Sequence, residues 1–219
     1  MVINKPPHLA TLEDRQEPDN VLAYARHYVE AAQVCHRLDK DTSGVLAIAK
    51  NPEAYRHLSM QFEARTVNKI YHAIVDGLHK FENILVDKPI IKTDDGLVKI
   101  GRDGKSAQTS FTSLRPYRIH TLVECRPVTG RMHQIRIHLT VLNAPITGDV
   151  IYGGKEFYLS SVKRDFNLKK DTDEQPLIKR MALHSYALEF RNLADSTVKI
   201  EAPYPKDFQA LVRQLELND

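Results

Sequence analysis

The chain has 219 residues, 42% of them hydrophobic, and a formal net charge of +3. This length allows one large domain that buries enough surface to fold without a disulfide or a structural metal. No apolar stretch approaches the roughly 20 residues that cross a bilayer, the N-terminus lacks the pattern of a signal peptide, and Cys35 and Cys125 show no CxxC spacing. We therefore expect a soluble cytoplasmic protein with reduced cysteines and no membrane contact.

Cap residues and helical spacing of apolar side chains predict the helices. The first is expected over residues 20–33, beginning at Asn20. The sequence Asn51-Pro52-Glu53 predicts a second start, with a capping Asn, a Pro at the first helical position and an acid in the first turn. The buried stripe of that helix is expected to consist of Tyr55, Leu58 and Phe62. A last amphipathic helix follows Asp207, with apolar residues at positions 208, 211, 212 and 215.

Strands are predicted where apolar residues alternate or are rich in β-branched types, in segments 70–75, 84–91, 107–114, 121–126, 186–190 and 197–202. Pro89 makes the second of these an edge strand or a broken one. Residues 155–180 mix charges of both signs with few apolar positions, which predicts either a flexible loop or a contact with a polyanion. The elements do not alternate regularly, so we predict a single α+β domain over 1–219, with a central mixed, largely antiparallel sheet flanked by helices.

The segment 36–44, HRLDKDTSG, leads into the apolar run 45–49, which predicts a buried strand. It places Asp39 beside Arg37 in a polar loop, where a fixed scaffold meets solvent and sites of chemistry are often built. A neighbouring cation favours a carboxylate form, and an ionised aspartate can act as a nucleophile or a base without a metal. Asp, Ser and Gly also fill turns before strands for local hydrogen-bonding reasons, so the segment alone leaves a structural turn open.

Five basic side chains and no acid lie between positions 126 and 138, among them Arg131 and His133. Such a cluster is the electrostatic footprint of a phosphate backbone, although a solvated face explains it equally well. If a helix begins here, Arg136 is partly buried and needs an anionic partner, for which Asp39 is the candidate. Nucleotide-binding and zinc motifs are absent, so metal and cofactor chemistry is not indicated, and His184 is expected to be structural.

Five segments occur in one order along the chain: HRLDKDTSG at 36–44, KIYHAIV at 69–75, TGRMHQIRIHL at 129–139, PITGD at 145–149 and LHS at 183–185. Together they resemble the RluA-type RNA pseudouridine synthases, from NKP at 4–6 to the Ala-Pro pair at 202–203. The resemblance implies the fold of that family and isomerisation of uridine to pseudouridine in ribosomal or transfer RNA, without a cofactor or a metal. The base is detached from C1′, turned, and rejoined through C5.

The resemblance also implies roles for individual residues. Asp39 matches the catalytic aspartate, and Tyr71 matches the tyrosine that packs on the base and helps to remove the C5 proton. Arg136 matches the arginine paired with the aspartate, and Arg37 matches an arginine that fills the space left by the extruded base. Tyr71 as an ordinary strand tyrosine remains the alternative from the residues alone. We expect Arg37, Arg131 and His133 to contact RNA.

The sequence departs from the family at its start. The family usually shows Lys-Pro-x-Gly where this chain has Lys5-Pro6-Pro7-His8. Because glycine permits a backbone conformation that histidine tolerates poorly, we expect that loop to differ in shape. A preceding strand and an S4-type RNA-binding domain are missing from the sequence, which predicts either a minimal member or a truncated start. No heptad or long apolar surface helix suggests an oligomer, so we expect a monomer.

Two other functions compete with that of a synthase. The first is an RNA-binding or RNA-chaperone protein, which has no need of an aspartate facing a polyanion. The second is a nucleoside or glycoside hydrolase with Asp39 as nucleophile. Such hydrolases commonly need a second carboxyl group, and nothing in the sequence marks Asp41 as that partner.

Overall fold

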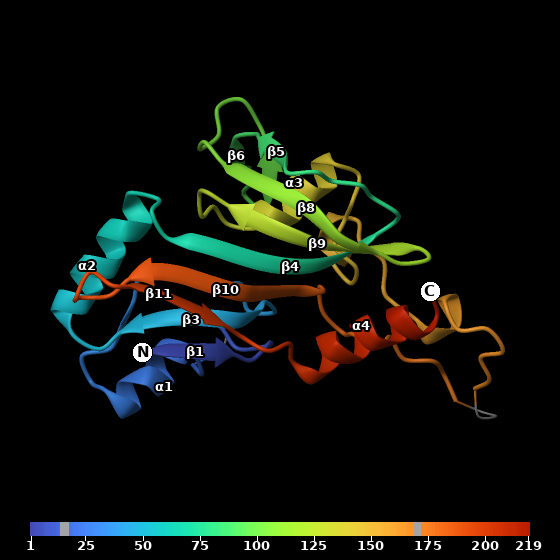
Figure 1. Cartoon of the computed structure of the whole chain (residues 1–219), viewed down its shortest axis with the longest axis horizontal. Coiled ribbons are helices and arrows are strands. Elements are labelled where there is room, and N and C mark those ends of the chain that lie inside the picture. Colours follow the sequence, from blue (N-terminus) through green and yellow to red (C-terminus); the bar gives the residue numbers. More distant parts are fainter. Residues whose placement is uncertain (14–17, 169–171) are drawn as a thin grey trace. The chain divides into compact units, whose positions relative to one another are not determined.

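The computed structural model describes residues 1–13, 18–168 and 172–219, and the chain divides into two compact units (Figure 1). Unit 1 comprises Met1–Tyr71 and His184–Pro203, and unit 2 comprises His72–Leu183 and Tyr204–Asp219. Each unit combines strands with helices, so the predicted α+β class is confirmed. The assignment of 1–219 to one catalytic domain stays a prediction. No helix among the described residues has both the length and the apolar character that a bilayer crossing requires.

The strands of unit 1 form a mixed, largely antiparallel arrangement. Strand β3 (Ser43–Ala49) pairs in antiparallel fashion with β1 (Val2–Lys5) and β2 (Gln33–Val34), and in parallel with β10 (Leu183–Arg191). Strand β11 (Thr197–Glu201) is antiparallel to β10. Every residue of β3 is buried, as the apolar run that follows HRLDKDTSG predicts.

The described part of unit 1 contains two helices, α1 (Val21–Tyr28) and α2 (Pro52–Glu63). Both predicted starts are confirmed, because Asn20 accepts a hydrogen bond from the Ala23 amide at 2.9 Å and Asn51 accepts one from the Ala54 amide at 2.8 Å. The predicted end of the first helix is wrong: Val29 is extended, with φ −142°, and the chain then enters β2.

The predicted buried stripe of α2 is only partly right. Leu58 is buried and Phe62 packs against the same apolar cluster, which includes Val45 and Leu188. Tyr55 is 38% exposed and lies outside the cluster. Tyr55 therefore lies at the exposed end of the helix face that Leu58 and Phe62 share.

Unit 2 contains strands in the order β4-β9-β8-β5 and a separate β6-β7 pair. Their bounds are β4 (Asn68–Asp76, of which the last five residues belong to unit 2), β5 (Ile84–Asp87), β6 (Ile90–Lys92), β7 (Val98–Ile100), β8 (Gln108–Pro116) and β9 (His120–Pro127). The predicted strand 84–91 is broken at residues 88 and 89, and β5 ends the strand order, as the position of Pro89 indicated.

The helices of unit 2 are α3 (Gln134–Val141) and α4 (Lys206–Leu217), with the short 3₁₀ turns η1 (Val150–Tyr152) and η2 (Leu159–Ser161). Helix α3 lies against β7, β8 and β9. Helix α4 buries Phe208, Leu211 and Leu215, which confirms three of the four positions of its predicted apolar stripe, whereas Val212 is half-buried.

Both ends of the segment 155–180 are packed within unit 2. Phe157 and Ile178 form a bridge and are each 1% exposed. Val162 and Arg180 are buried as well. The lysines and the aspartate at 169–171, part of the charged stretch noted in the sequence, lie outside the described residues. A flexible loop there stays a prediction.

Candidate active site

Asp39 is the first residue of a β-turn that leads into β3. The Thr42 amide donates to the Asp39 carbonyl at 3.0 Å, which closes the turn over Lys40 and Asp41. Asp39 is half-buried, while Arg37 and Lys40 are exposed. The carboxylate is thus carried on backbone of fixed conformation at the edge of the solvent.

The residue before Asp39 is anchored to the core of unit 1. The Thr11 hydroxyl donates to the Leu38 carbonyl at 2.8 Å and accepts from the Leu38 amide at 3.1 Å. The Leu38 side chain lies in an apolar cluster with Leu46 and Ile48, and Tyr71 packs against that cluster. The structure therefore brings the predicted tyrosine and the backbone next to the predicted aspartate onto one core.

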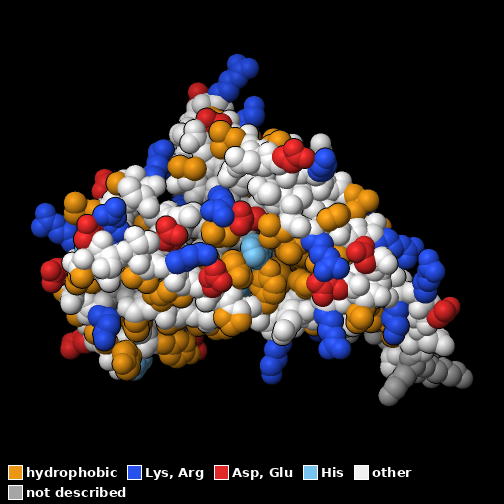
Figure 2. Space-filling view, viewed as in Figure 1, with side chains coloured by type: hydrophobic (Ala, Val, Ile, Leu, Met, Phe, Trp, Pro, Cys, Tyr) orange, Lys and Arg blue, Asp and Glu red, His pale blue; other side chains and the backbone are white. Residues whose placement is uncertain are grey.

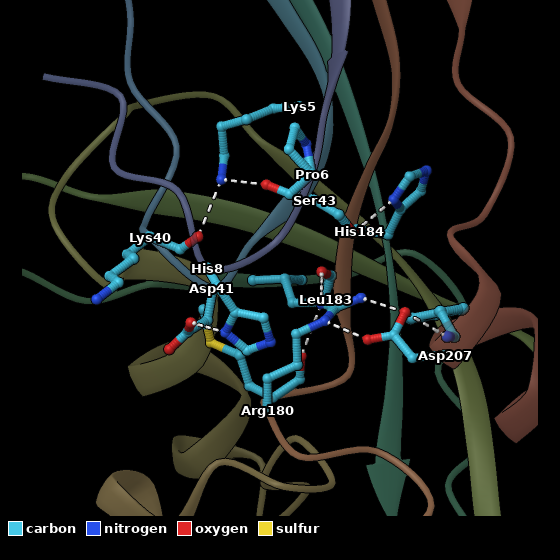
Figure 3. A network of polar contacts seen from close by, with 12 residues as sticks. Lys5, Pro6, His8, Lys40, Asp41, Ser43, Arg180, Leu183, His184 and Asp207 are labelled. Carbon is cyan, nitrogen blue, oxygen red and sulfur yellow. Dashed lines mark hydrogen bonds and ion pairs between the residues drawn. The ribbon is translucent and has the colours of Figure 1, made fainter. Parts of the chain in front are cut away.

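The residues after Asp39 are held by the last residue of β1 and by the segment that follows it (Figure 3). The Lys5 side chain is fully buried, and its ammonium donates to the carbonyls of Pro6, Leu9 and Lys40 at 2.8–2.9 Å. Three carbonyls match the three donors of an ammonium, which a buried charge requires. The last of these contacts fixes the peptide directly after Asp39.

His8 has φ 62°, in the left-handed region that glycine favours. Histidine thus adopts here the conformation that we expected it to tolerate poorly, and a difference in loop shape from the family stays a prediction. The imidazole Nδ1 lies 2.8 Å from Asp41 Oδ1, and this contact between His8 and Asp41 accompanies the uncommon backbone conformation (Figure 3).

His36, the first residue of HRLD, has a structural position. Its ring stacks on Phe62 with centroids 4.5 Å apart, and its Nε2 accepts from the Ala47 amide at 3.0 Å. Burial, with a smaller contribution from the Lys69 charge, lowers the pKa of His36 to about 3. A neutral ring whose Nε2 accepts from β3 carries its hydrogen on Nδ1, and this contact secures the start of the loop.

The segment Thr42-Ser43-Gly44 also has a structural explanation. Gly44 has φ 112°, and a Cβ at this position would lie 2.1 Å from the carbonyl oxygen of Ser185 in the parallel strand. Ser43 Oγ lies 2.9 Å from His184 Nδ1, and His184 Nε2 lies 3.1 Å from the Ala202 carbonyl. Both ring nitrogens of His184 are therefore engaged, and its predicted structural role is confirmed.

In unit 2, Arg136 is buried on α3, as the sequence predicted. Its Nε and Nη2 donate to the two carboxylate oxygens of Asp149, each at 2.7 Å, and its guanidinium lies 4.7 Å from the centroid of the Tyr152 ring. The sequence placed Asp149 in a motif without giving it a role. The predicted pair of Arg136 with Asp39 would join residues of different units and stays a prediction.

Arg131 and His133 lie at the start of α3 and make contacts within unit 2. Arg131 Nε donates to the Ser106 carbonyl at 3.1 Å, and His133 Nδ1 lies 2.9 Å from the Tyr152 hydroxyl. The Gln134 amide oxygen accepts from the Arg131 amide at 2.9 Å. These contacts order the N-terminal end of α3, and RNA binding by Arg131 and His133 stays a prediction.

The basic cluster between positions 126 and 138 is less positive than the sequence suggested. Arg126 pairs with Glu124, two positions earlier, at 2.6 Å. His138 is buried between Thr109 and the Lys88 carbonyl, and burial lowers the pKa of its imidazole. On the face drawn in Figure 2, basic and acidic side chains are interspersed. Among residues 1–13, 18–168 and 172–219, no three His, Cys, Asp or Glu side chains are grouped to hold a metal ion.

Comparison with known proteins gives concordant matches. A family model described as RNA pseudouridylate synthase matches residues 1–140. The chain is 35% identical to ribosomal large subunit pseudouridine synthase D of Xanthomonas campestris, over 98% of this chain and 66% of the relative. It is also 35% identical to an uncharacterised RNA pseudouridine synthase of Zymomonas mobilis, over 96% of this chain and 92% of the relative. The chain spans only 50–66% of the ribosomal large subunit pseudouridine synthases that it matches in several bacteria.

Among solved structures, the human protein named RNA pseudouridylate synthase domain containing 4 is similar to this chain. The TM-score is 0.71 at 26% sequence identity, over 98% of this chain and 89% of the human one. This likeness confirms the predicted fold.

Proposed function

Because the chain belongs to the RNA pseudouridylate synthase family, we propose that it isomerises uridine to pseudouridine within RNA. The observation that carries the proposal is the placement of Asp39. It begins a turn whose neighbouring residues are bonded to Thr11 and Lys5, so its carboxylate is presented from a fixed frame at the solvent edge. Groups that react with a bound substrate need such support from the residues around them.

The proposed reaction is balanced within the nucleotide. The N1–C1′ bond breaks, a C5–C1′ bond forms, C5 loses a proton and N1 gains one. Asp39 attacks the ribose–base unit or removes a ribose proton, and Tyr71 packs on the base and assists removal of the C5 proton. In this proposal Arg136 pairs with Asp39 during the reaction, and no cofactor or metal takes part.

The uridine has to leave its stack before Asp39 can reach C1′. Extrusion costs a few kcal/mol in a paired or stacked region. Arg37 is exposed two residues before Asp39, so its guanidinium can stack in the vacated space and offset part of that cost. Arg131 and His133 contact the RNA backbone in the same proposal.

Ribosomal RNA is the substrate class that we favour. Support comes from the relatives named as ribosomal large subunit pseudouridine synthases C and D. Transfer RNA is the second candidate. We further propose that the protein acts as a monomer in the cytoplasm, where both RNA classes are made and used in bacteria.

Release of tritium from C5 of uridine tests the proposal. The protein is incubated with transcripts of ribosomal and transfer RNA that carry [5-³H]uridine and no pseudouridine. We expect tritium release with the base retained in the RNA, abolished by Asp39→Asn and unchanged by Glu53→Gln, an exposed carboxylate of α2. An RNA-binding protein would release no tritium, and a hydrolase would liberate free uracil. Either result from the wild type, or full activity of Asp39→Asn, would overturn the proposal.

A further inference from the structure

The segment 5–9 contacts both central residues of the turn that Asp39 begins. The Lys5 ammonium binds the carbonyl of Lys40 at 2.9 Å, and His8 Nδ1 lies 2.8 Å from Asp41 Oδ1. The two contacts are of different kinds, since one holds a peptide group and the other holds a side chain. The contact at Asp41 therefore adds a side-chain restraint to a turn whose backbone is already held at Leu38 and Lys40.

His8 makes its contact from a backbone conformation that a residue with a Cβ adopts only at a cost. Its φ of 62° is one that glycine would adopt freely. The side chain is therefore what histidine adds at this position, and Figure 3 shows its ring directed at the Asp41 carboxylate. To donate to that oxygen, Nδ1 has to carry the ring hydrogen.

The pair is open to solvent, with side chains 57% exposed for His8 and 45% for Asp41. Exposed pairs of this kind contribute little to global stability. A contact with a small effect on stability can still restrict the orientation of the turn that carries a reacting carboxylate. The rate of the chemical step is sensitive to small displacements of that carboxylate. The effect of the pair is therefore expected in the chemical step.

We propose that His8 is a positioning residue for Asp39, acting through its hydrogen bond to Asp41. This inference rests on the proposed synthase function. With His8 in place, every neighbour of Asp39 is secured: Leu38 by Thr11, Lys40 by Lys5, Asp41 by His8, and Thr42 by the turn itself.

Three substitutions at residue 8 separate the backbone from the side chain. His8→Gly keeps the left-handed conformation and removes the contact. His8→Asn tolerates the same conformation and places an amide nitrogen at the same number of bonds from Cα as Nδ1, so it restores a donor to Asp41. Asp195→Gly is the matched control, because Asp195 also has a positive φ, is exposed in unit 1, and pairs with a charged neighbour, Arg191.

The measurement is the single-turnover rate of tritium release at saturating enzyme, with RNA affinity determined separately by filter binding. For His8→Gly we expect a rate about three- to tenfold slower, with RNA affinity and thermal midpoint unchanged. His8→Asn should recover the rate to within about twofold of the wild type, and Asp195→Gly should match the wild type. The double variant His8→Gly, Asp41→Ala should be no slower than the slower of its single variants.

A wild-type rate for His8→Gly, a loss confined to RNA affinity, or an equal loss for His8→Asn would overturn the positioning role. So would additive losses in the double variant. These results are distinct from failure of the proposed function, in which the wild type itself releases no tritium from any of the RNAs. If His8→Gly does not fold, Asp41→Ala tests the same hydrogen bond from the other side.

Discussion

Arg136 directs two guanidinium nitrogens onto the two carboxylate oxygens of Asp149, and both distances are 2.7 Å. The two side chains are 7% and 2% exposed, so the pair is almost fully removed from water. The parallel contacts match the planar fork of the guanidinium to the carboxylate. This pair joins α3 to the start of η1.

Removing one partner of this pair should be strongly destabilising. Asp149→Ala removes two charge-assisted hydrogen bonds from a buried guanidinium, and we expect a loss of about 3–5 kcal/mol in the free energy of unfolding. The double variant Arg136→Met, Asp149→Leu removes both charges and should recover most of that loss. Urea unfolding at pH 7 measures both. A loss below about 1 kcal/mol in the single variant would contradict a stabilising role for the two hydrogen bonds between Arg136 and Asp149.

The sequence predicted the elements best where a local signal acts alone. The capping asparagines at 20 and 51 mark helix starts through hydrogen bonds that span three residues, and Pro89 marks a break in a strand through its own missing amide. The end of α1 was missed because Val29 turns into extended backbone without a Gly or Pro to signal it. Such an end is decided by pairing of the next segment with β3.

The surroundings of the candidate site were less accessible from the sequence. The frame around Asp39 consists of contacts across 27 to 35 positions, from Thr11, His8 and Lys5. Asp149 was missed as the partner of Arg136 because the intervening chain bends at Gly148, where φ is 80°. The residue types at these positions identify a family, but the pairs follow only from the fold.

Gly44 provides a test of the close approach between β3 and β10. Gly44→Ala would place Cβ 2.1 Å from the Ser185 carbonyl oxygen at a positive φ, so we expect roughly 3 kcal/mol or more of destabilisation. Gly96→Ala has a positive φ but no atom within 4 Å of its Cβ, and should lose about 1 kcal/mol. Gly130→Ala meets neither obstacle and should be near neutral. Thermal unfolding ranks the stabilities of the three variants. Similar losses of stability for Gly44→Ala and Gly96→Ala would rule out the clash with the Ser185 carbonyl as the cause.

Stability should fall on acidification because of His36. Its pKa is about 3 in the folded protein, against 6.5 as the ordinary value, because the ring is buried. Below pH 6.5 the unfolded chain binds a proton that the folded protein excludes, so stability decreases by about 1.4 kcal/mol per pH unit towards pH 3. The loss from this residue alone should reach about 2 kcal/mol at pH 5.

The variant His36→Gln isolates this effect, because it keeps an acceptor for the Ala47 amide and does not titrate. Urea unfolding of both proteins at pH 7, 6 and 5 gives two slopes. The other histidines are the same in both proteins, so their contributions cancel in the comparison. We expect the wild type to lose stability more steeply than the variant, and parallel slopes would refute a neutral, buried His36.

Arg37 should matter more when the target uridine is stacked. Its exposed guanidinium can fill the gap that an extruded base leaves, and an unstructured oligonucleotide has little stacking to replace. For Arg37→Ala we expect turnover to fall about tenfold on a structured hairpin and about twofold or less on an unstructured oligonucleotide with the same uridine. Arg56→Ala, which removes an exposed arginine of α2 in the same unit, controls for loss of charge and should affect both RNAs equally. If Arg37→Ala slows both RNAs by the same factor, Arg37 acts as a general phosphate contact rather than in base extrusion.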